Sequence, residues 1–166
     1  MRKRVTFLLP VAIALMAGML LFVQSTGAAT KMPAFSLENV ITGEEVNSET
    51  FAGKSLLITF FATWCPPCIQ EIPNLIEVHD EFGPERFSVV GLSVDQEGSK
   101  VVKRLVEKKS INYPVMMADK RTTRDFGGVY GIPTSFLVNG KGNVVKKYTG
   151  YIPHSVLIKD IKQVIE

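Results

Sequence analysis

The chain has 166 residues, of which 46% are apolar, a length that suits one domain with a sizeable core plus an extension. The formal charge of +3 arises entirely within residues 1–29, which hold three basic residues and no acidic one. The remaining residues carry 16 basic and 16 acidic side chains and are neutral. This balance argues against the strongly basic surface of a nucleic-acid-binding protein, and we expect no nucleic-acid partner.

Residues 1–29 have the pattern of an export segment. Three basic residues at positions 2–4 precede an uncharged, mostly apolar run over residues 5–23, and small residues follow at positions 27–29. We predict a signal peptide over residues 1–29, with an uncleaved N-terminal membrane anchor through residues 5–23 as the alternative. In either case the basic residues stay in the cytoplasm, so the rest of the chain is expected to be extracytoplasmic, in the periplasm.

The first elements of the exported part are strands. Alternating apolar and polar residues over 32–38, with a turn and a return strand over 41–46, predict an N-terminal β-hairpin. Residues 48–53 predict a short helical turn. Residues 55–61 are too continuously apolar for a half-exposed strand, and we predict a central strand that is buried on both faces.

Both cysteines of the chain follow this strand, as Cys65 and Cys68 at the start of a helix predicted over residues 66–82. A Cys-x-x-Cys pair that opens a helix places its first sulfur beside unpaired backbone N–H groups and the positive end of the helix dipole, which stabilise a thiolate. The second sulfur lies one turn along, close enough to form or resolve a disulfide. We therefore predict a redox-active disulfide in which Cys65 is the exposed, attacking sulfur and Cys68 the resolving one.

A structural disulfide and a zinc site both suit the pair less well. A disulfide over a two-residue loop would constrain the unfolded chain very little. A zinc site normally needs four ligands, and this chain has no second cysteine pair. Its only histidines, His79 and His154, are isolated in sequence, and we expect each to be exposed or linked to a helix dipole. The sequence therefore predicts no bound metal and no organic cofactor.

Apolar spacing and turn residues divide the rest of the chain. The predicted elements are a strand over 87–94, a helix over 99–109, an edge segment over 113–117, a weak helix over 124–130, hairpin strands over 134–138 and 143–148, and a last helix over 154–165. Parallel strands joined by a helix, then an antiparallel hairpin and a closing helix, predict an α/β domain with a mixed central sheet and helices on both faces.

Three motifs together resemble the thioredoxin fold. They are Trp64-Cys65-Pro66-Pro67-Cys68 after a buried strand, Pro73 in the following helix, and Tyr130-Gly131-Ile132-Pro133-Thr134 before a late strand. The N-terminal hairpin, an insertion between residues 97 and 119 that carries an extra helix, and the export segment resemble the TlpA/ResA-like branch of extracytoplasmic thiol-disulfide oxidoreductases. The resemblance covers residues 32–166 and implies a thioredoxin-like domain over residues 30–166.

The resemblance also implies substrate-binding residues. It implies a cis peptide bond before Pro133, which packs beside the sulfurs, whereas an ordinary trans turn is the alternative. A cis bond would expose the backbone of Ile132, so that an extended substrate segment can pair with it across from Cys65. Trp64 would lie at the carboxyl edge of the sheet, where we expect it to cover the dithiol and touch substrate.

Glu71 is the candidate for proton transfer. Cytoplasmic thioredoxins carry a buried aspartate six residues before the first cysteine, but this chain has Thr59 there, which is no base near neutral pH. Glu71, three residues beyond Cys68, matches a glutamate that TlpA/ResA-like proteins place near the active site. It is therefore the candidate proton acceptor for Cys68, and the alternative is a solvated helix residue or the partner of a nearby lysine.

The resemblance implies a protein-disulfide oxidoreductase that works reductively. Its partners would be client proteins with cysteine pairs, such as apocytochrome c in cytochrome c-type biogenesis, and a membrane thiol carrier that donates electrons. Two alternatives belong to other classes. A copper-delivery protein would need a histidine beside the cysteines. A peroxiredoxin-type peroxidase would need a Pro-x-x-x-Thr-x-x-Cys motif, which the residues before Cys65 do not supply.

Overall fold

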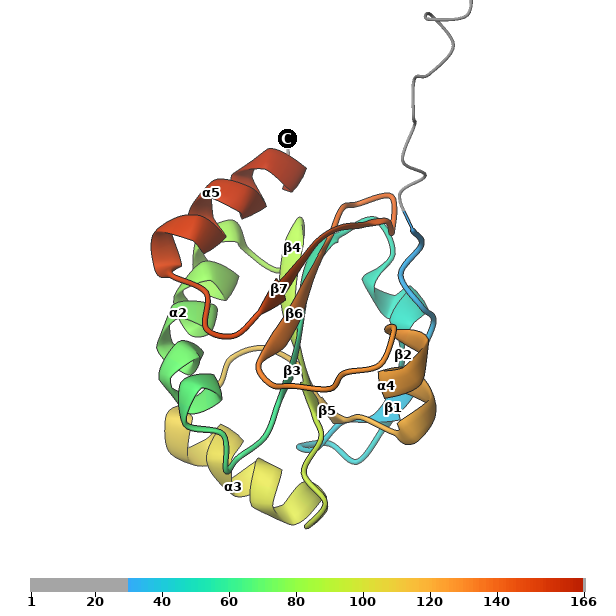
Figure 1. Cartoon of the computed structure of the whole chain (residues 1–166), viewed down its shortest axis with the longest axis vertical. Helices are drawn as coiled ribbons and strands as arrows, with labels where there is room; N and C mark the ends of the chain where they lie inside the picture. The colour runs from blue at the N-terminus through green and yellow to red at the C-terminus, as the bar shows by residue number, and fades with distance from the viewer. Residues whose placement is uncertain (1–29, 166) are drawn as a thin grey trace, which may run out of the picture.

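A five-stranded mixed sheet organises residues 30–165, the part of the chain that the computed structural model describes (Figure 1). The predicted export segment, residues 1–29, lies outside the described residues. The elements in chain order are β1 (Ser36–Glu38), β2 (Glu45–Asn47), the 3-10 helix η1 (Ser48–Phe51), β3 (Ser55–Phe61), α2 (Pro66–Phe82), β4 (Phe87–Ser93), α3 (Ser99–Lys109), β5 (Val115–Met117), α4 (Lys120–Asp125), β6 (Thr134–Val138), β7 (Val144–Thr149) and α5 (His154–Ile165).

The strand order of the sheet is β5-β4-β3-β6-β7, and β1 and β2 form a separate antiparallel pair. β3 is central: it runs parallel to β4 and antiparallel to β6. All seven residues of β3 are buried, as the continuous apolar run predicts. The predicted hairpin, mixed sheet and inserted helix α3 are therefore confirmed.

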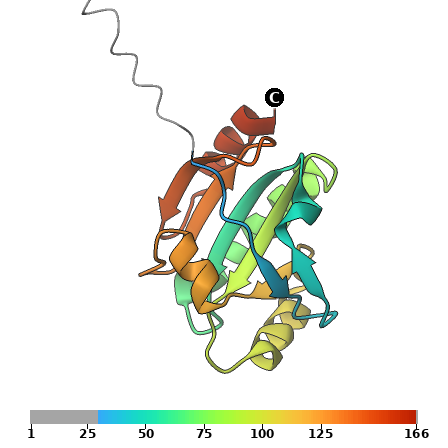
Figure 2. The same cartoon turned by 90° about the vertical axis from the view of Figure 1, so that its right-hand side faces the viewer.

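Each face of the sheet has its own apolar layer. Because side chains alternate along a strand, Leu57 and Phe61 of β3 pack toward α2, α3 and α5, whereas Leu56, Ile58 and Phe60 pack toward the other face. On that second face lie the β1–β2 hairpin, η1 and α4 (Figures 1 and 2). The central strand is thus covered on both sides, and its carboxyl end is held firmly in place.

Sequence-local signals set the bounds of α2. Cys65 is its N-cap residue, and Pro66 and Pro67 occupy the first turn, where a missing N–H does no harm. The helix ends at Gly83, whose φ of 69° is in the left-handed region that glycine adopts at little cost. The start of α2 follows directly from the carboxyl end of β3, and this junction carries both cysteines.

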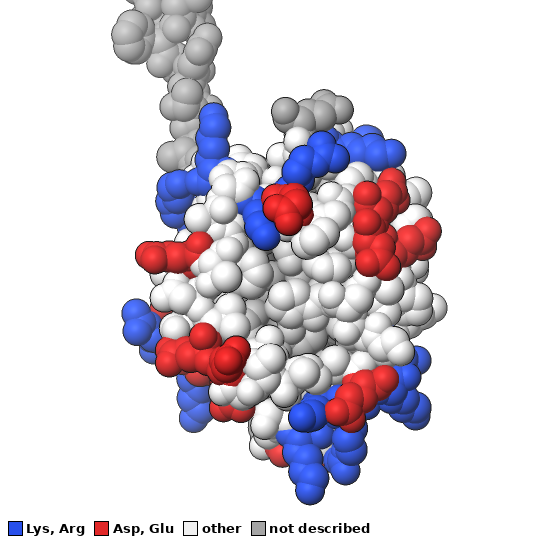
Figure 3. Space-filling model, turned by 180° about the vertical axis from the view of Figure 1, so that it is seen from behind, with Lys and Arg blue, Asp and Glu red and all other residues white. Residues whose placement is uncertain are grey.

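The surface of residues 30–165 carries charges of both signs. Seen from behind, Lys, Arg, Asp and Glu side chains lie mostly around the margin, and the centre of this face is uncharged (Figure 3). Within the same residues, no helix combines the length and the apolar character that a membrane span needs.

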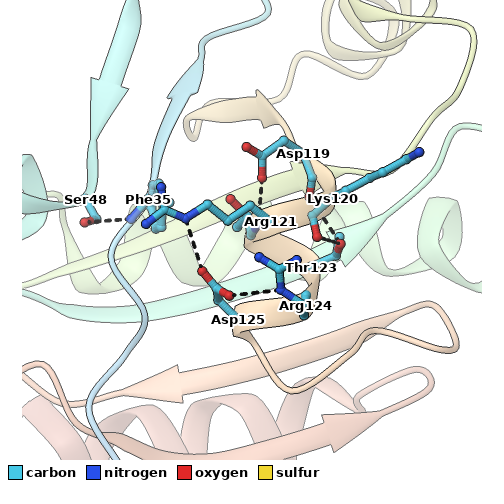
Figure 4. Close-up of polar contacts among 9 residues, drawn as sticks. Phe35, Ser48, Asp119, Lys120, Arg121, Thr123, Arg124 and Asp125 are labelled. Atoms are coloured by element: carbon cyan, nitrogen blue, oxygen red, sulfur yellow. Dashed lines mark hydrogen bonds and ion pairs between the residues drawn. The ribbon is translucent and has the colours of Figure 1, made fainter.

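The prediction of a helix over 124–130 is wrong: α4 spans residues 120–125. The Asp119 side chain accepts a hydrogen bond from the Thr122 N–H at 2.6 Å and so caps an earlier start. Gly127 and Gly128, with φ of 82° and 75°, turn the chain away from the helix. On its surface, Arg121 and Arg124 both approach Asp125, at 3.5 and 3.6 Å (Figure 4). These polar side chains have no apolar periodicity from which the helix could be predicted.

We expect His79 to be exposed or linked to a helix dipole; it lies in the last turn of α2, but it is not exposed. His79 is 8% exposed, and its Nδ1 accepts a hydrogen bond from the Val89 N–H at 3.2 Å. β5 pairs with β4 only from Gly91 onward, so the imidazole takes the place of a strand partner at Val89. Burial lowers the pKa of His79.

Both edges of the sheet are partly covered by the N-terminal part of the chain. Next to β5, the Val40 N–H donates to the Val115 carbonyl at 3.0 Å, and Asn39 forms a bridge with Met116. Next to β7, residue 31 forms a bridge with residue 143.

Candidate functional site

Cys65 and Cys68 form a disulfide at the junction of β3 and α2, with their Cα atoms 5.3 Å apart. The Cys68 N–H points at the Cys65 Sγ, at 3.3 Å, and the Ile69 N–H donates to the Cys65 carbonyl at 3.1 Å. Pro66 and Pro67 have no backbone N–H and cannot donate a hydrogen bond to the sulfur. Cys65 Sγ therefore receives the first N–H that the helix can donate, and this contact persists as a favourable one if the sulfur becomes a thiolate.

Both cysteines are equally buried, at 3% exposure each, so the expectation that Cys65 is the more exposed sulfur is wrong for the disulfide-bonded protein. They belong to the apolar cluster between the sheet and α2, and Ile132, distant in sequence, packs against this cluster. Burial of this kind depends on tertiary contacts and cannot be read from a helix start. What distinguishes the two sulfurs is the N–H contact that only Cys65 receives.

Asp95 fixes the turn that carries the first cysteine. Its carboxylate accepts hydrogen bonds from the Thr63 N–H at 2.9 Å, the Thr63 hydroxyl at 2.6 Å and the Ser93 hydroxyl at 2.8 Å. Asp95 is 6% exposed. β3 and β4 are parallel neighbours, so Thr63 and Asp95, which follow their carboxyl ends, meet at one edge of the sheet although they are 32 residues apart.

Glu71 is almost fully buried, at 1% exposure, on the same helix as the cysteines. Its Oε1 accepts a hydrogen bond from the Ile152 N–H at 2.8 Å. Burial raises the pKa of Glu71 from its ordinary 4.5 to about 7, against the opposing effect of that hydrogen bond. The pKa of buried Tyr113 is raised too, by its own burial first and then by the charge of Glu71. The alternative for Glu71, a solvated helix residue, is therefore excluded.

Glu71 lies three residues beyond Cys68, and side chains at this spacing are neighbours on one helix face, about 5–6 Å apart at Cβ. At the position of the thioredoxin aspartate, Thr59 is 2% exposed, and its Oγ1 accepts a hydrogen bond from the Ser135 hydroxyl at 2.9 Å. That position is thus neutral and satisfied, so the buried acid near the cysteines comes from the helix rather than from the strand.

The Ile132–Pro133 peptide bond is cis, as expected. The neighbouring groups are tied down: the Thr134 hydroxyl donates to the Gly131 carbonyl at 2.6 Å, and the Gly150 N–H donates to the Pro133 carbonyl at 2.8 Å. The backbone N–H and C=O of Ile132, by contrast, have no hydrogen-bond partner within residues 30–165. They are free to pair with an extended segment of another chain.

Trp64 is 65% exposed, so it leaves a large part of its ring open to a partner. It lines an open groove of about 550 Å³ beside the dithiol, together with residues of α2 and the last residue of α3. The lining includes Pro66, Ile69, Pro73 and Lys109. A mixed surface thus adjoins the cysteines, with Thr63 and Gln70 beside the apolar side chains and one basic side chain.

Sequence reasoning missed Asp95 and Ile152. Asp95 could have been found, because an acid directly after a strand predicted next to residues 55–61 must lie at the same sheet edge as the cysteines. Ile152 contributes only its backbone N–H, which no residue pattern signals. Within the described range, no three His, Cys, Asp or Glu side chains lie close enough together to hold a metal ion.

Comparisons with known proteins identify the family of the chain. The family model described as Redoxin matches residues 27–165. Thiol-disulfide oxidoreductase ResA of Bacillus subtilis (strain 168) is 29% identical over 134 residues, which cover 81% of this chain and 74% of that protein. ResA of Halalkalibacterium halodurans is 28% identical over 116 residues, which cover 70% and 65% of the two chains.

A solved structure shows the same architecture. It is the thiol:disulfide interchange protein, a thioredoxin family protein, of Chlorobium tepidum TLS, which is 36% identical with a TM-score of 0.76 and matches 83% of this chain and 97% of its own. The predicted thioredoxin-like fold is thereby confirmed. The chain belongs to the Redoxin family and is a TlpA/ResA-like thiol-disulfide oxidoreductase of the thioredoxin superfamily.

Proposed function

We propose that the protein reduces disulfides of exported client proteins through Cys65 and Cys68. The single observation that carries this proposal is the dithiol pair at the start of α2 with the buried acid Glu71 on the same helix. The Cys65 thiolate attacks a client disulfide, forms a mixed disulfide and releases one client thiolate. Cys68 then loses its proton to Glu71, attacks the Cys65 Sγ and releases the second client thiolate. Two electrons thus pass from the protein to the client.

The groups around the dithiol would hold the client. An extended client segment pairs with the free backbone groups of Ile132, beside the cis Pro133, and places its sulfur against Cys65. Trp64 offers an exposed ring next to the reacting sulfurs. We infer no metal or organic cofactor in this reaction, because the two cysteines carry both electrons.

In the reduced protein, Cys65 is expected to react with limiting iodoacetamide at least about tenfold faster than Cys68, because a thiolate stabilised by about one pKa unit is tenfold more abundant. The cause is the Cys68 N–H and the helix dipole, both of which act on Cys65 Sγ. Mass spectrometry of the labelled peptides measures the ratio. Single Cys65→Ser and Cys68→Ser variants serve as standards, and preferential labelling of Cys68 would overturn the assignment.

Pro66 and Pro67 favour the reduction of client disulfides over the oxidation of client thiols. A strong oxidant of this superfamily has a strongly stabilised thiolate, which makes its reduced form stable. Here Pro66 and Pro67 remove two N–H donors from the first turn of α2, so the Cys65 thiolate is stabilised only moderately. The reduced protein therefore gives up its electrons readily.

We expect the reduction potential to lie nearer to about −270 mV than to about −120 mV, the reducing and oxidising extremes of related proteins. Equilibration of the full chain with dithiothreitol buffers of graded composition, followed by counting of free thiols, measures it. Replacing Pro66 and Pro67 by Ala restores two donors and should shift the potential toward oxidation. A wild-type value near the oxidising extreme would contradict the reductive function.

The wider role rests on the resemblance and on residues 1–29. We propose that these residues export the protein, as a cleaved signal peptide or as a membrane anchor through residues 5–23, and that it works in the periplasm. A reductant in an oxidising compartment needs an electron supply, which we assign to a membrane thiol carrier. We propose apocytochrome c, with its cysteine pair, as a client, and hence a role in cytochrome c-type biogenesis.

A further inference from the structure

The inserted helix α3 carries an unusual concentration of positive charge. Its 11 residues contain five basic side chains and one acid, Glu107. Residues 30–166 are neutral as a whole, so the remainder holds 11 basic and 15 acidic residues. The basic side chains are Lys100, Lys103, Arg104, Lys108 and Lys109. One helix therefore has a charge opposite to that of the rest of the domain.

Four of the five basic side chains lie on one outward face of the helix, together with Glu107. α3 buries Val102 and Val106 against the sheet, whereas residues 100, 103, 104, 107 and 108 share the opposite face by their helical spacing and are exposed. None of the five basic side chains has an ion-pair partner among residues 30–165. We call this surface the basic face of α3.

The stability of the helix does not explain the basic face. Lys100 lies in the first turn, at the positive end of the helix dipole, and Gly98 provides no side-chain cap there. Lys100 and Arg104, and Arg104 and Lys108, are like-charged pairs four residues apart, each destabilising by about 0.2–0.5 kcal/mol. Only the basic residues of the last turn suit the dipole. Glu107, opposite in charge to Lys103 and Arg104 at four and three residues, offsets part of this cost. Helix stability alone therefore does not account for five basic residues in α3, which points to a role outside the fold.

The basic face ends close to the dithiol. Lys109, which follows Lys108 at the end of α3 and lies on the side of Val102 and Val106, is exposed and lines the groove that also contains Trp64 and Pro66, the residues on either side of Cys65. The end of the molecule where α3 lies carries a gathering of Lys and Arg side chains (Figure 3). A protein that approaches Cys65 through this groove therefore meets the positive charge of Lys109, and the basic face begins at the next residue, Lys108.

We propose that the basic face of α3 docks an acidic segment of the client protein, beside the disulfide that Cys65 attacks. The proposal rests on the client-reducing function above and adds the class of client: one whose Asp and Glu residues cluster near its cysteine pair. Long-range attraction of this kind raises the association rate more than the final affinity, and salt screens it.

The test uses three synthetic peptides with one shared disulfide core and acidic, neutral or basic flanks. Second-order rates are measured for the reduced full chain with each disulfide peptide, and for the oxidised full chain with each dithiol peptide, so that the charge effect is seen whichever direction is favoured. At about 0.01 M salt, where the Debye length is about 30 Å, the acidic peptide should react about tenfold faster than the neutral one. At about 0.15 M salt most of this difference should vanish.

The deciding variant carries Lys100→Glu, Lys103→Glu and Arg104→Glu. Acids suit the first turns of a helix, so this variant should fold and should lose the preference for the acidic peptide. The matched control carries Lys31→Glu, Lys54→Glu and Lys141→Glu. These three lysines line a separate pocket, so the control should keep the preference for the acidic peptide. Both variants change the net charge equally, so a global charge effect would affect them alike.

Several outcomes would overturn the proposal. Equal rates for the three peptides at low salt, or equal loss in both variants, would show that the basic face does not dock clients. Unchanged peptide rates with weaker binding of only the α3 variant to phosphatidylserine vesicles would assign the face to membranes instead. Failure of the reductive function is recognised separately, because the neutral peptide would then be oxidised but not reduced.

Discussion

Replacing Glu71 with Gln is expected to slow the resolution of the mixed disulfide by about 10²-fold, the low end of the range for losing a general base. Attack by Cys65 should stay largely unchanged, because only the second step requires Cys68 to lose a proton. Gln keeps the acceptor for the Ile152 N–H, so the fold should survive. The wild-type rate of resolution should rise with pH through about 7, as Glu71 ionises, and this inflection should be missing from the variant.

Trapping measures this effect. Glu71→Gln should accumulate more client–protein complex than wild type, though less than Cys68→Ser, in which no resolving thiol remains. Glu77→Gln is the matched control, because Glu77 lies on the same helix with a side chain that is 64% exposed. Equal resolution rates in wild type and Glu71→Gln between about pH 5 and about pH 8 would show that water or another group takes the proton.

The stability of the oxidised protein should fall as the pH rises from 4.5 through about 7, because Glu71 must then be charged in a buried place. Its pKa is higher in the folded state, at about 7, than its ordinary 4.5, so folding favours the protonated acid. The stabilisation is complete below pH 4.5 and is lost above about 7, a change of up to about 3 kcal/mol. The stability of Glu71→Gln should not fall with pH in this way, because Gln does not ionise. At neutral pH the variant should therefore be more stable than wild type.

Urea unfolding of the disulfide-bonded protein across this range checks the prediction, since the paired cysteines do not titrate. His79 acts in the opposite sense: its lowered pKa means that stability is lost as the pH falls below the ordinary 6.5. Subtracting the curve of Glu71→Gln from that of wild type cancels this contribution. Asp119 and Asp160, whose pKa values lie below 3.8, act outside the range. Parallel curves for the two proteins would refute the buried charge of Glu71.

Much of the fold could be predicted because its signals are local. The bounds of α2, α3, β6 and α5 agree with the sequence prediction, since apolar spacing marks the buried face and Gly, Pro or Asn marks the ends. α4 has neither signal. Its start depends on the Asp119 side chain, and the apolar residue that anchors it, Phe126, lies just past its end and packs on Phe60 and Phe136.

The site was predictable in its residue types and less so in its environment. The cysteine pair is carried by a short motif, whereas the cis proline and Glu71 are implied by the resemblance to the TlpA/ResA-like branch. The burial of Glu71 and of Cys65 arises from segments that are distant in sequence, such as the loop of Ile152 and the loop of Ile132. These contacts determine the pKa of Glu71, so the resemblance identified the acid but the sequence did not show that its pKa is raised.

The coverage of the two sheet edges has a consequence for solubility. An uncovered edge strand presents a row of unpaired N–H and C=O groups, which can recruit the edge of another molecule and begin aggregation. Asn39 and Val40 occupy part of that row beside β5, and the bridge from residue 31 occupies part of it beside β7. Along the rest of β7, Lys146 and Lys147 are exposed charges that an approaching strand would have to bury. The N-terminal part of the domain thus works against self-association, which matters for a protein whose task is to bring other extended chains alongside its own backbone.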